Sequence, residues 1–205
     1  MQITQITELS KTRSKVYIDQ EFAFVLYKGE LRLYHICEGA ELSEQDYRQI
    51  MQEVLPKRAK LRALNLLKSR EYTEAQLRIK LEQGLYPGKV INEALKYVAS
   101  FHYIDDLRYA VSYITYHEES KGRRRIEQDL QRKGISREVM ERAWQSWEEN
   151  GGQKDDLQII QKLLEKKHFD PETADYKEQQ RIAAYLMRKG FTGEQIRKAM
   201  KTSLL

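Results

Sequence analysis

The sequence is poor in cysteine, proline and glycine. One cysteine, Cys37, excludes a disulfide framework and is typical of a reducing compartment. Three prolines and ten glycines in 205 residues argue against a long disordered or linker-rich protein. The longest apolar run, residues 22–27, is far shorter than the roughly 20 residues that cross a bilayer, and residues 1–11 lack the features of a signal peptide. We therefore expect a cytoplasmic protein, and the membrane-spanning, secreted and fibrous classes are excluded.

Groups that carry out catalysis are also sparse. No glycine-rich phosphate-binding loop of the Walker or dinucleotide type occurs in the sequence. The four histidines lie far apart, and the close pair of His35 and Cys37 is more often incidental than a zinc site. Asp105 and Asp106 precede an apolar helical stripe, so we interpret them as a helix N-terminus rather than as metal ligands. The sequence predicts no enzyme, and no bound cofactor or metal.

Charge is plentiful and unevenly spread. Charged residues make up 33% of the chain, and the formal net charge is +5. Residues 1–56 carry six basic and nine acidic side chains, whereas residues 57–205 carry 30 basic and 22 acidic ones. Two stretches, residues 57–80 and 121–133, are locally more basic. Such stretches occur on solvated helix faces and on surfaces that bind polyanions such as nucleic acid, and charge alone leaves both interpretations open.

The first 56 residues combine strand and helix patterns. β-Branched and aromatic residues cluster in residues 15–19 and 22–26, and an alternating pattern over 31–36 follows an expected turn at 27–30. We predict strands in these three segments and a further edge strand around residues 3–9. From Ser43 the period becomes helical, with a cap formed between Ser43 and Asp46. Pro56 is expected to end this helix and to close the first region.

The remainder of the chain repeats itself. Leu81, Leu130 and Leu186 are 49 and 56 residues apart, and a glycine-containing turn, a capping hydroxyl and a small helical residue recur around them. A period near 50 indicates supersecondary units that stack on their neighbours. Each unit is predicted to hold three helices. Asn150, Gly151 and Gly152 form the expected flexible joint between the second unit and the third.

The predicted architecture is therefore mainly α: an elongated array of three tandem three-helix repeats with a small N-terminal β-containing segment. The expected regions are 1–56 for the sheet and its helix, and 57–103, 104–150 and 151–205 for the three repeats. In the second and third repeats the expected helices are 107–117, 124–133, 137–147, 157–166, 176–188 and 193–201.

Several motifs resemble those of the bacterial RecX regulatory proteins. Residues 63–81 (ALNLLKSREYTEAQLRIKL) are similar to the opening signature of that family. Residues 103–110 and 121–135 resemble its central motifs, and residues 188–197 resemble its terminal motif. The match spans about residues 58–201 in the right order. The segment 1–55 is similar to the extension of family members from low-GC Gram-positive bacteria.

The resemblance implies a negative regulator of the RecA recombinase, built from tandem three-helix repeats. Such a protein is expected to lie in the groove of the RecA–DNA filament and to suppress strand exchange, ATPase and coprotease activities in recombinational DNA repair and the SOS response. It would act by blocking filament extension or by promoting disassembly. The implied partner is the RecA nucleoprotein filament, with single- or double-stranded DNA as a further candidate. The resemblance supplies no catalytic residue, and we further expect a monomer with no membrane partner.

Basic residues of the two positively charged stretches are the candidate contacts with the filament or with DNA. They are Arg70, Arg78, Lys80, Lys121, Arg123, Arg124, Arg125, Arg132 and Lys133. Two other classes stay open. An autonomous DNA-binding protein that uses basic helical repeats would bind bare duplex with a steep salt dependence, although the interleaved acids argue against tight binding. A helical-repeat adaptor for another protein would bind neither recombinase nor DNA.

Overall fold

Three antiparallel strands open the chain, and the structure describes residues 1–202. β1 (Ile3–Ser10), β2 (Arg13–Ile18) and β3 (Glu21–Tyr27) form a meander in that order. Asp19 and Gln20 both have positive φ, which makes the tight turn that suits the twist of the flanking strands. Val16 on β2 pairs with Phe24 on β3, and both side chains are fully buried. The strands predicted at 15–19, at 22–26 and around 3–9 are confirmed.

The strand predicted over residues 31–36 is wrong, because this segment begins as a helix. In this computed structural model, α1 (Lys28–Leu33) follows β3 directly, and the Tyr27 N–H donates to Glu30 Oε2 at 2.7 Å. The same carboxylate pairs with Arg58 Nη1 at 2.6 Å, and His35 then reverses the chain with a φ of 51°. Local capping and a distant ion pair override the alternating pattern. Cys37 consequently lies exposed in the loop after the helix.

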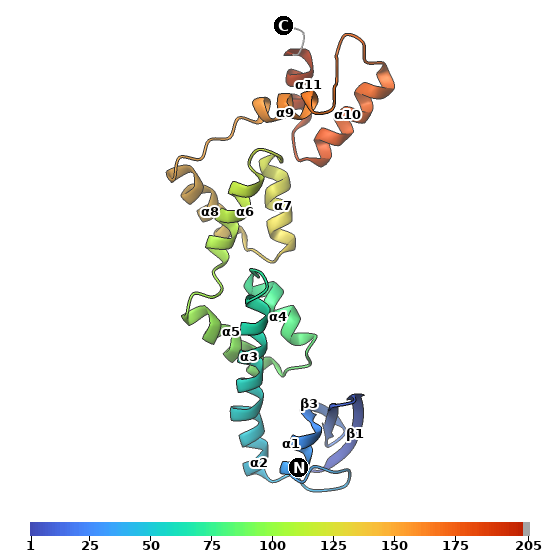
Figure 1. Ribbon diagram of the computed structural model, residues 1–205, viewed down its shortest axis with the longest axis vertical. Helices are drawn as coiled ribbons and strands as arrows, with labels where there is room; N and C mark the ends of the chain where they lie inside the picture. Colours follow the sequence, from blue (N-terminus) through green and yellow to red (C-terminus); the bar gives the residue numbers. More distant parts are fainter. Residues whose placement is uncertain (203–205) are drawn as a thin grey trace. The chain divides into compact units, whose positions relative to one another are not determined.

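One long helical rod follows the sheet. It consists of α2 (Glu44–Gln49), the π-helical turn η1 (Ile50–Val54) and α3 (Leu55–Leu67), which run on without a break (Figure 1). The predicted cap is confirmed, since the Asp46 N–H donates to Ser43 Oγ at 3.0 Å. Pro56 does not end the helix as expected. Proline lacks an N–H donor, and the π turn just before it, in which the Leu55 N–H reaches the Ile50 carbonyl, shifts the bonding register so that the proline is accommodated.

The first three-helix repeat is completed by α4 (Glu74–Glu82) and α5 (Gly88–Ser100), which pack on α3. α4 begins with the predicted capping box: the Gln76 N–H donates to Thr73 Oγ1 at 3.1 Å, and the Thr73 N–H donates to Gln76 Oε1 at 3.3 Å. Leu81 is fully buried. It belongs to the same apolar cluster as Ile3 and Phe24, so the sheet and the first repeat share one hydrophobic core in the compact unit Met1–Asp105.

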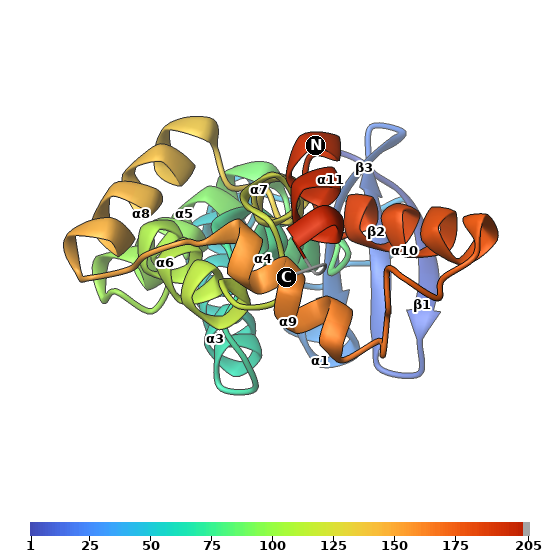
Figure 2. The same cartoon turned by 90° about the horizontal axis from the view of Figure 1, so that it is seen from above.

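The second compact unit, Asp106–Leu205, holds the other two repeats. Its helices are α6 (Asp106–His117), α7 (Arg123–Arg132), α8 (Arg137–Glu149), α9 (Asp156–Glu165), α10 (Tyr176–Arg188) and α11 (Gly193–Thr202). They agree with the predicted helices to within two residues at each end. Leu130 lies at the centre of one apolar core and Leu186 at the centre of another. Within the third repeat, Figures 1 and 2 both draw α9 beside α11. Each repeat of this unit therefore buries its own set of apolar side chains.

Candidate partner-binding surface

Three of the candidate basic residues lie in the first repeat. Arg78 on α4 donates to Asn92 Oδ1 at 2.7 Å and pairs with Glu74 at 3.3 Å. Lys80, on the same helix, donates to Gln83 Oε1 at 3.2 Å. Arg70 lies in the turn after α3, with its guanidinium 4.4 Å from the centre of the Tyr72 ring. Arg78 and Lys80 are half-buried and Arg70 is exposed. Each of the three side chains contacts a residue of its own unit.

The other six candidates lie together around α7 in the second repeat. Gly122 is the N-cap of α7 and offers no side-chain cap, and residues 123–125 place three arginines in the first turn. Cations are unfavourable at the positive end of a helix dipole. Two acids one turn later compensate for two of the three arginines: Glu127 accepts from Arg123 Nε at 2.8 Å, and Asp129 accepts from Arg125 Nε at 3.2 Å.

Asp129 is the centre of the largest charge network around α7. Lys121 Nζ donates to Asp129 Oδ2 at 2.9 Å, the Tyr113 hydroxyl lies at 3.2 Å from the same oxygen, and Arg132 Nη1 lies 3.7 Å from Oδ1. The Asp129 side chain is only 12% exposed and that of Lys121 only 19%. Burial by itself raises the pKa of Asp129, but the hydrogen bond and charge of Lys121, with the charge of Arg125, lower the pKa below its ordinary value. Lys121 is thus held by its own repeat.

This network predicts a pH-dependent contribution to stability. Because the pKa of Asp129 is lowered in the folded chain, the stabilisation is present above its ordinary pKa of 3.8 and is lost as pH falls through the folded value. We expect Asp129→Asn to lower the free energy of unfolding by about 1–3 kcal/mol near neutral pH. The difference from wild type, measured by urea unfolding from about pH 6 to about pH 3, should shrink towards the acid end. A difference that stays constant with pH would contradict this role of the carboxylate.

The outward side of α7 carries the more accessible cations. Arg123 is half exposed and stacks over the Trp144 ring at 4.7 Å. Arg124 is exposed and forms no ion pair or side-chain hydrogen bond with any described residue. Both line a hollow between α7 and α8 together with Arg137 and Met140. Arg132 is two-thirds exposed despite its contact with Asp129. Lys133 Nζ lies 5.4 Å from the centre of the Tyr113 ring. The accessible positive charge of this repeat therefore centres on Arg123, Arg124 and Arg132.

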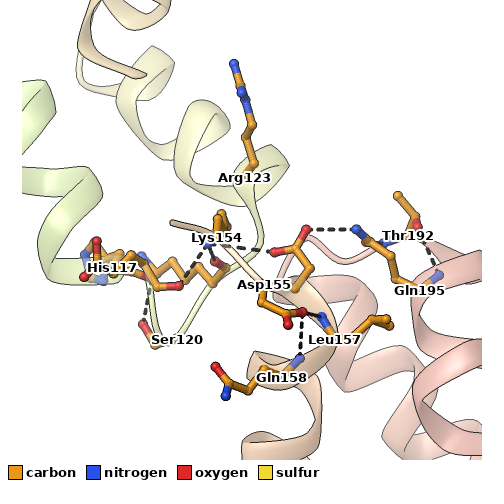
Figure 3. Close-up of polar contacts among 12 residues, drawn as sticks. His117, Ser120, Arg123, Lys154, Asp155, Leu157, Gln158, Thr192 and Gln195 are labelled. Atoms are coloured by element: carbon orange, nitrogen blue, oxygen red, sulfur yellow. Dashed lines mark hydrogen bonds and ion pairs between the residues drawn. The ribbon is translucent and has the colours of Figure 1, made fainter. Parts of the chain in front are cut away.

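A buried lysine joins the second repeat to the third. Lys154 is 10% exposed, and its Nζ donates to the carbonyl oxygens of Glu118 at 2.9 Å and Lys121 at 2.7 Å (Figure 3). Asp156 Oδ1 lies 3.9 Å from the same ammonium, and Asp156 Oδ2 accepts from Gln195 Nε2 at 2.8 Å. Burial lowers the pKa of Lys154, against the opposing effect of Asp156. The start of α9, the loop before α7 and α11 are thereby tied to one ammonium group.

Two glycines bring the second and third repeats into backbone contact. The Gly122 N–H donates to the Lys189 carbonyl at 2.9 Å. A Cβ atom on Gly190 would lie 2.6 Å from the Arg125 nitrogen, and one on Gly122 would lie 2.7 Å from the Gly190 oxygen. No side chain larger than hydrogen fits at either position without a shift of the backbone. The motif around residues 188–191 therefore packs directly against the start of α7.

Sequence reasoning missed several residues of this region. Lys154 has no pattern around it that marks it as buried, because its partners are backbone carbonyls. Lys167 and Lys189 lie with their ammonium groups 5.2 and 5.7 Å from the centre of the Tyr185 ring. Of these three lysines, Lys189 could have been singled out from the sequence, because it is part of the terminal motif. The contact between the repeats, rather than local sequence, brings Lys189 close to the start of α7.

Two further features bear on the class of protein. Within residues 1–202, no group of three or more His, Cys, Asp or Glu side chains is arranged to hold a metal ion. None of the helices in the same part of the chain combines the length and the apolar character needed to span a membrane.

The fold places the chain among the helical-repeat proteins: it is a tandem array of three-helix repeats preceded by a small sheet. Consecutive segments match family models for the first, second and third three-helix domains of RecX, over residues 59–97, 105–143 and 154–200. Together these matches cover more than half of the chain. The chain belongs to the RecX family.

Individual relatives agree with this assignment. The chain is 29% identical over 202 residues to the "Regulatory protein RecX" of Caldanaerobacter subterraneus subsp. tengcongensis, covering 98% of both chains. It is 28% identical over 198 residues to the protein of the same name from Listeria monocytogenes serovar 1/2a, covering 95% of this chain and 72% of that one. A solved structure described as a crystal structure of regulatory protein RecX superposes with a TM-score of 0.61 at 24% identity, covering 98% of each chain. RecX from Lactobacillus salivarius gives 0.59 at 23% identity, over 74% of this chain and 99% of that one. At such identities the two structures establish the fold.

Proposed function

We propose that this chain is a negative regulator of the RecA recombinase. It binds in the groove of the RecA–DNA filament and suppresses strand exchange, ATPase and coprotease activities, and so limits recombinational repair and the SOS response in the cytoplasm. The observation that carries this proposal is the succession of three RecX domains along the chain. The regulator acts by binding rather than by chemistry.

The charge arrangement around α7 supports binding to an assembled filament more than to bare duplex. Asp129 and Glu127 already neutralise much of the positive charge of Lys121, Arg125 and Arg123. Tight binding to free DNA requires many phosphate contacts by unpaired cations. A few accessible arginines, centred on Arg124, are better suited to add specificity to a larger protein–protein contact. The nine candidate residues remain the predicted interface.

The proposal is tested with the DNA-dependent ATPase of a bacterial RecA. We expect inhibition below one copy of this protein per RecA, and we expect extra single-stranded DNA to leave the inhibition in place. Such behaviour indicates action on the filament. If excess DNA abolishes the inhibition, the protein competes for the DNA template. It would then be an autonomous DNA-binding protein rather than a regulator that acts on the filament. If the ATPase is unaffected at all ratios, the proposal is wrong and an adaptor for another partner remains.

The predicted interface is tested with a charge reversal at Arg124, which is exposed. Arg124→Glu should raise the concentration for half-inhibition of the ATPase about tenfold, because it replaces an attraction with a repulsion. The fold should be unaffected, since Arg124 has no partner among the described residues. Arg142→Glu on α8 is the matched control: Arg142 is also exposed and lacks a partner in the same part of the chain. Equal inhibition by the two variants, with matched circular dichroism, would remove Arg124 from the interface.

A further inference from the structure

The loop between α6 and α7, residues 118–122, carries contacts of the second repeat with the third. Lys154 Nζ donates to two of its carbonyl oxygens, at 2.9 and 2.7 Å (Figure 3). At the end of the loop, the Gly122 N–H donates to the Lys189 carbonyl at 2.9 Å. A force that displaces this loop therefore acts on the contact between the two repeats.

His117 is the last residue of α6 and lies directly before this loop. The Lys121 N–H donates to the His117 carbonyl at 3.0 Å, so the loop is bonded to the end of the helix. The imidazole is half-buried, and its ring centre lies 4.3 Å from that of Tyr113 and 4.9 Å from that of Tyr116. Among the described residues, the His117 side chain forms no hydrogen bond or ion pair. No direct partner therefore compensates for a proton gained by this ring.

Cations of both repeats gather around the imidazole. Lys121 Nζ lies 5.2 Å and Lys133 Nζ 5.4 Å from the centre of the Tyr113 ring, against which His117 packs. Both lysines belong to the second repeat. Lys189 belongs to the third repeat, and its backbone is bonded to the residue after Lys121. The imidazole therefore lies in a cluster of lysines that spans the contact between the repeats.

Nearby acidic side chains do not balance this cluster. Asp129 faces it from α7, but its carboxylate already pairs with Lys121 at 2.9 Å and with Arg125 at 3.2 Å. Glu118, which follows the histidine in the chain, accepts a hydrogen bond from Trp147 Nε1 on α8 at 2.6 Å. Protonation of the imidazole therefore adds a charge to a group that is already positive.

The surroundings of His117 favour the neutral ring. Its pKa is lowered from the ordinary value of 6.5, and burial is the largest cause. The charge of Lys121 lowers the pKa further, as do those of Lys133 and Lys189. The charge of Asp129 acts in the opposite direction. Because the pKa is lower in the folded chain, the resulting stabilisation is present above pH 6.5 and is lost as the pH falls through the folded value.

We propose that His117 is a pH-sensitive switch for the contact between the second and third repeats. With a neutral imidazole, the loop after α6 stays closed on the third repeat. A protonated imidazole repels Lys121 on one side of the contact and Lys189 on the other, and the contact opens. Acidification then weakens any binding that needs residues from both repeats. The switch is a property of the chain alone and does not rest on the regulation of RecA.

The contact is measured in the full-length protein by amide hydrogen exchange of the Gly122 N–H, which donates to the third repeat. Protection, corrected for the intrinsic exchange rate at each pH, should fall severalfold between about pH 7.5 and about pH 5.5. Two other amides serve as references. The Ile3 N–H, bonded to the Ala40 carbonyl in the first unit, should keep its protection. The Ile135 N–H, in the core of the second repeat, should keep it as well.

Variants separate the histidine from other groups that titrate in acid. His117→Phe keeps a ring against Tyr113 and Tyr116 but cannot be protonated, so Gly122 protection should no longer change with pH. His117→Gln should behave in the same way and decides the matter if circular dichroism shows that the phenylalanine variant misfolds. Lys189→Gln should reduce the fall in protection, because it removes the cation on the far side of the contact. Lys177→Gln, an exposed lysine near the start of α10 without a partner in the described chain, should leave the fall as in wild type.

The proposal is overturned if Gly122 keeps its protection in acid, or if the folded variants of His117 lose it as wild type does. An equal loss at Ile135 would show that the second repeat unfolds as a whole, which also contradicts a switch at the contact. If Lys189→Gln leaves the fall unchanged, repulsion across the two repeats is not its cause and the proposal is wrong.

Discussion

Replacement of Gly190 by alanine is expected to destabilise the second unit by about 3 kcal/mol or more. Gly190 has a φ of +94°, a conformation that side chains other than glycine rarely adopt. A new Cβ would also lie 2.5 Å from the Cβ of Arg125 and 2.6 Å from its nitrogen, both in a neighbouring repeat. These atoms belong to the first turn of α7 and cannot move away independently. The variant must therefore strain its own backbone and push the third repeat off the second.

Gly151→Ala separates these two costs. Gly151 has a similar φ of +88°, yet a Cβ there would meet nothing within 4 Å. It should cost only about 1 kcal/mol, from backbone strain alone. Urea unfolding followed by tryptophan fluorescence measures both variants, because Trp144 and Trp147 are the two tryptophans of the chain and both lie in the core of the second repeat. Equal losses of stability in the two variants would show that the close approach to Arg125 is unimportant.

The repeats could be predicted from the sequence because they depend on local patterns. Leucines such as Leu130 and Leu186 recur at helical spacing, and Thr73 and Thr192 are followed by glutamines that complete capping boxes. The predictions failed where a distant contact decides the local structure. Glu30, paired with Arg58 from α3, stabilises a helix where the sequence alternates like a strand.

The site could be predicted only in part, for a similar reason. The cations around α7 can be read from the sequence, but the sequence does not show which of them already pair with acidic side chains of the protein. Lys121 is half-buried and paired with Asp129, whereas Arg124 three residues later has no described partner. Lys189 takes its place beside α7 only because Gly190 permits the close approach of two backbones. Contacts between repeats, rather than composition, decide which cations remain available to a partner.

The joint between the second and third repeats contains two glycines, yet it is held by packing and by Lys154. Gly152 lies directly against the Trp147 side chain, and Lys154 donates hydrogen bonds to two carbonyl oxygens of the loop before α7. Lys154→Met keeps most of the unbranched side chain but removes its donors. The two carbonyls and the partly buried Asp156 then lose their compensation, so we expect the free energy of unfolding of the second unit to fall by about 2–4 kcal/mol. Proteolysis near Gly151 should also become faster, because the joint opens more often.

Lys162→Met is the matched control, since Lys162 also bridges the two repeats. Its Nζ lies 3.8 Å from Glu119 Oε1, but both side chains are more than half exposed. Exposed ion pairs contribute about 0–1 kcal/mol, so this variant should unfold almost as wild type does. If the two variants lose the same stability, burial of the Lys154 ammonium is not what fastens the repeats. If only Lys154→Met loosens the joint, the two repeats act as one body because a single charge is buried between them, and binding that needs residues from both repeats should weaken with it.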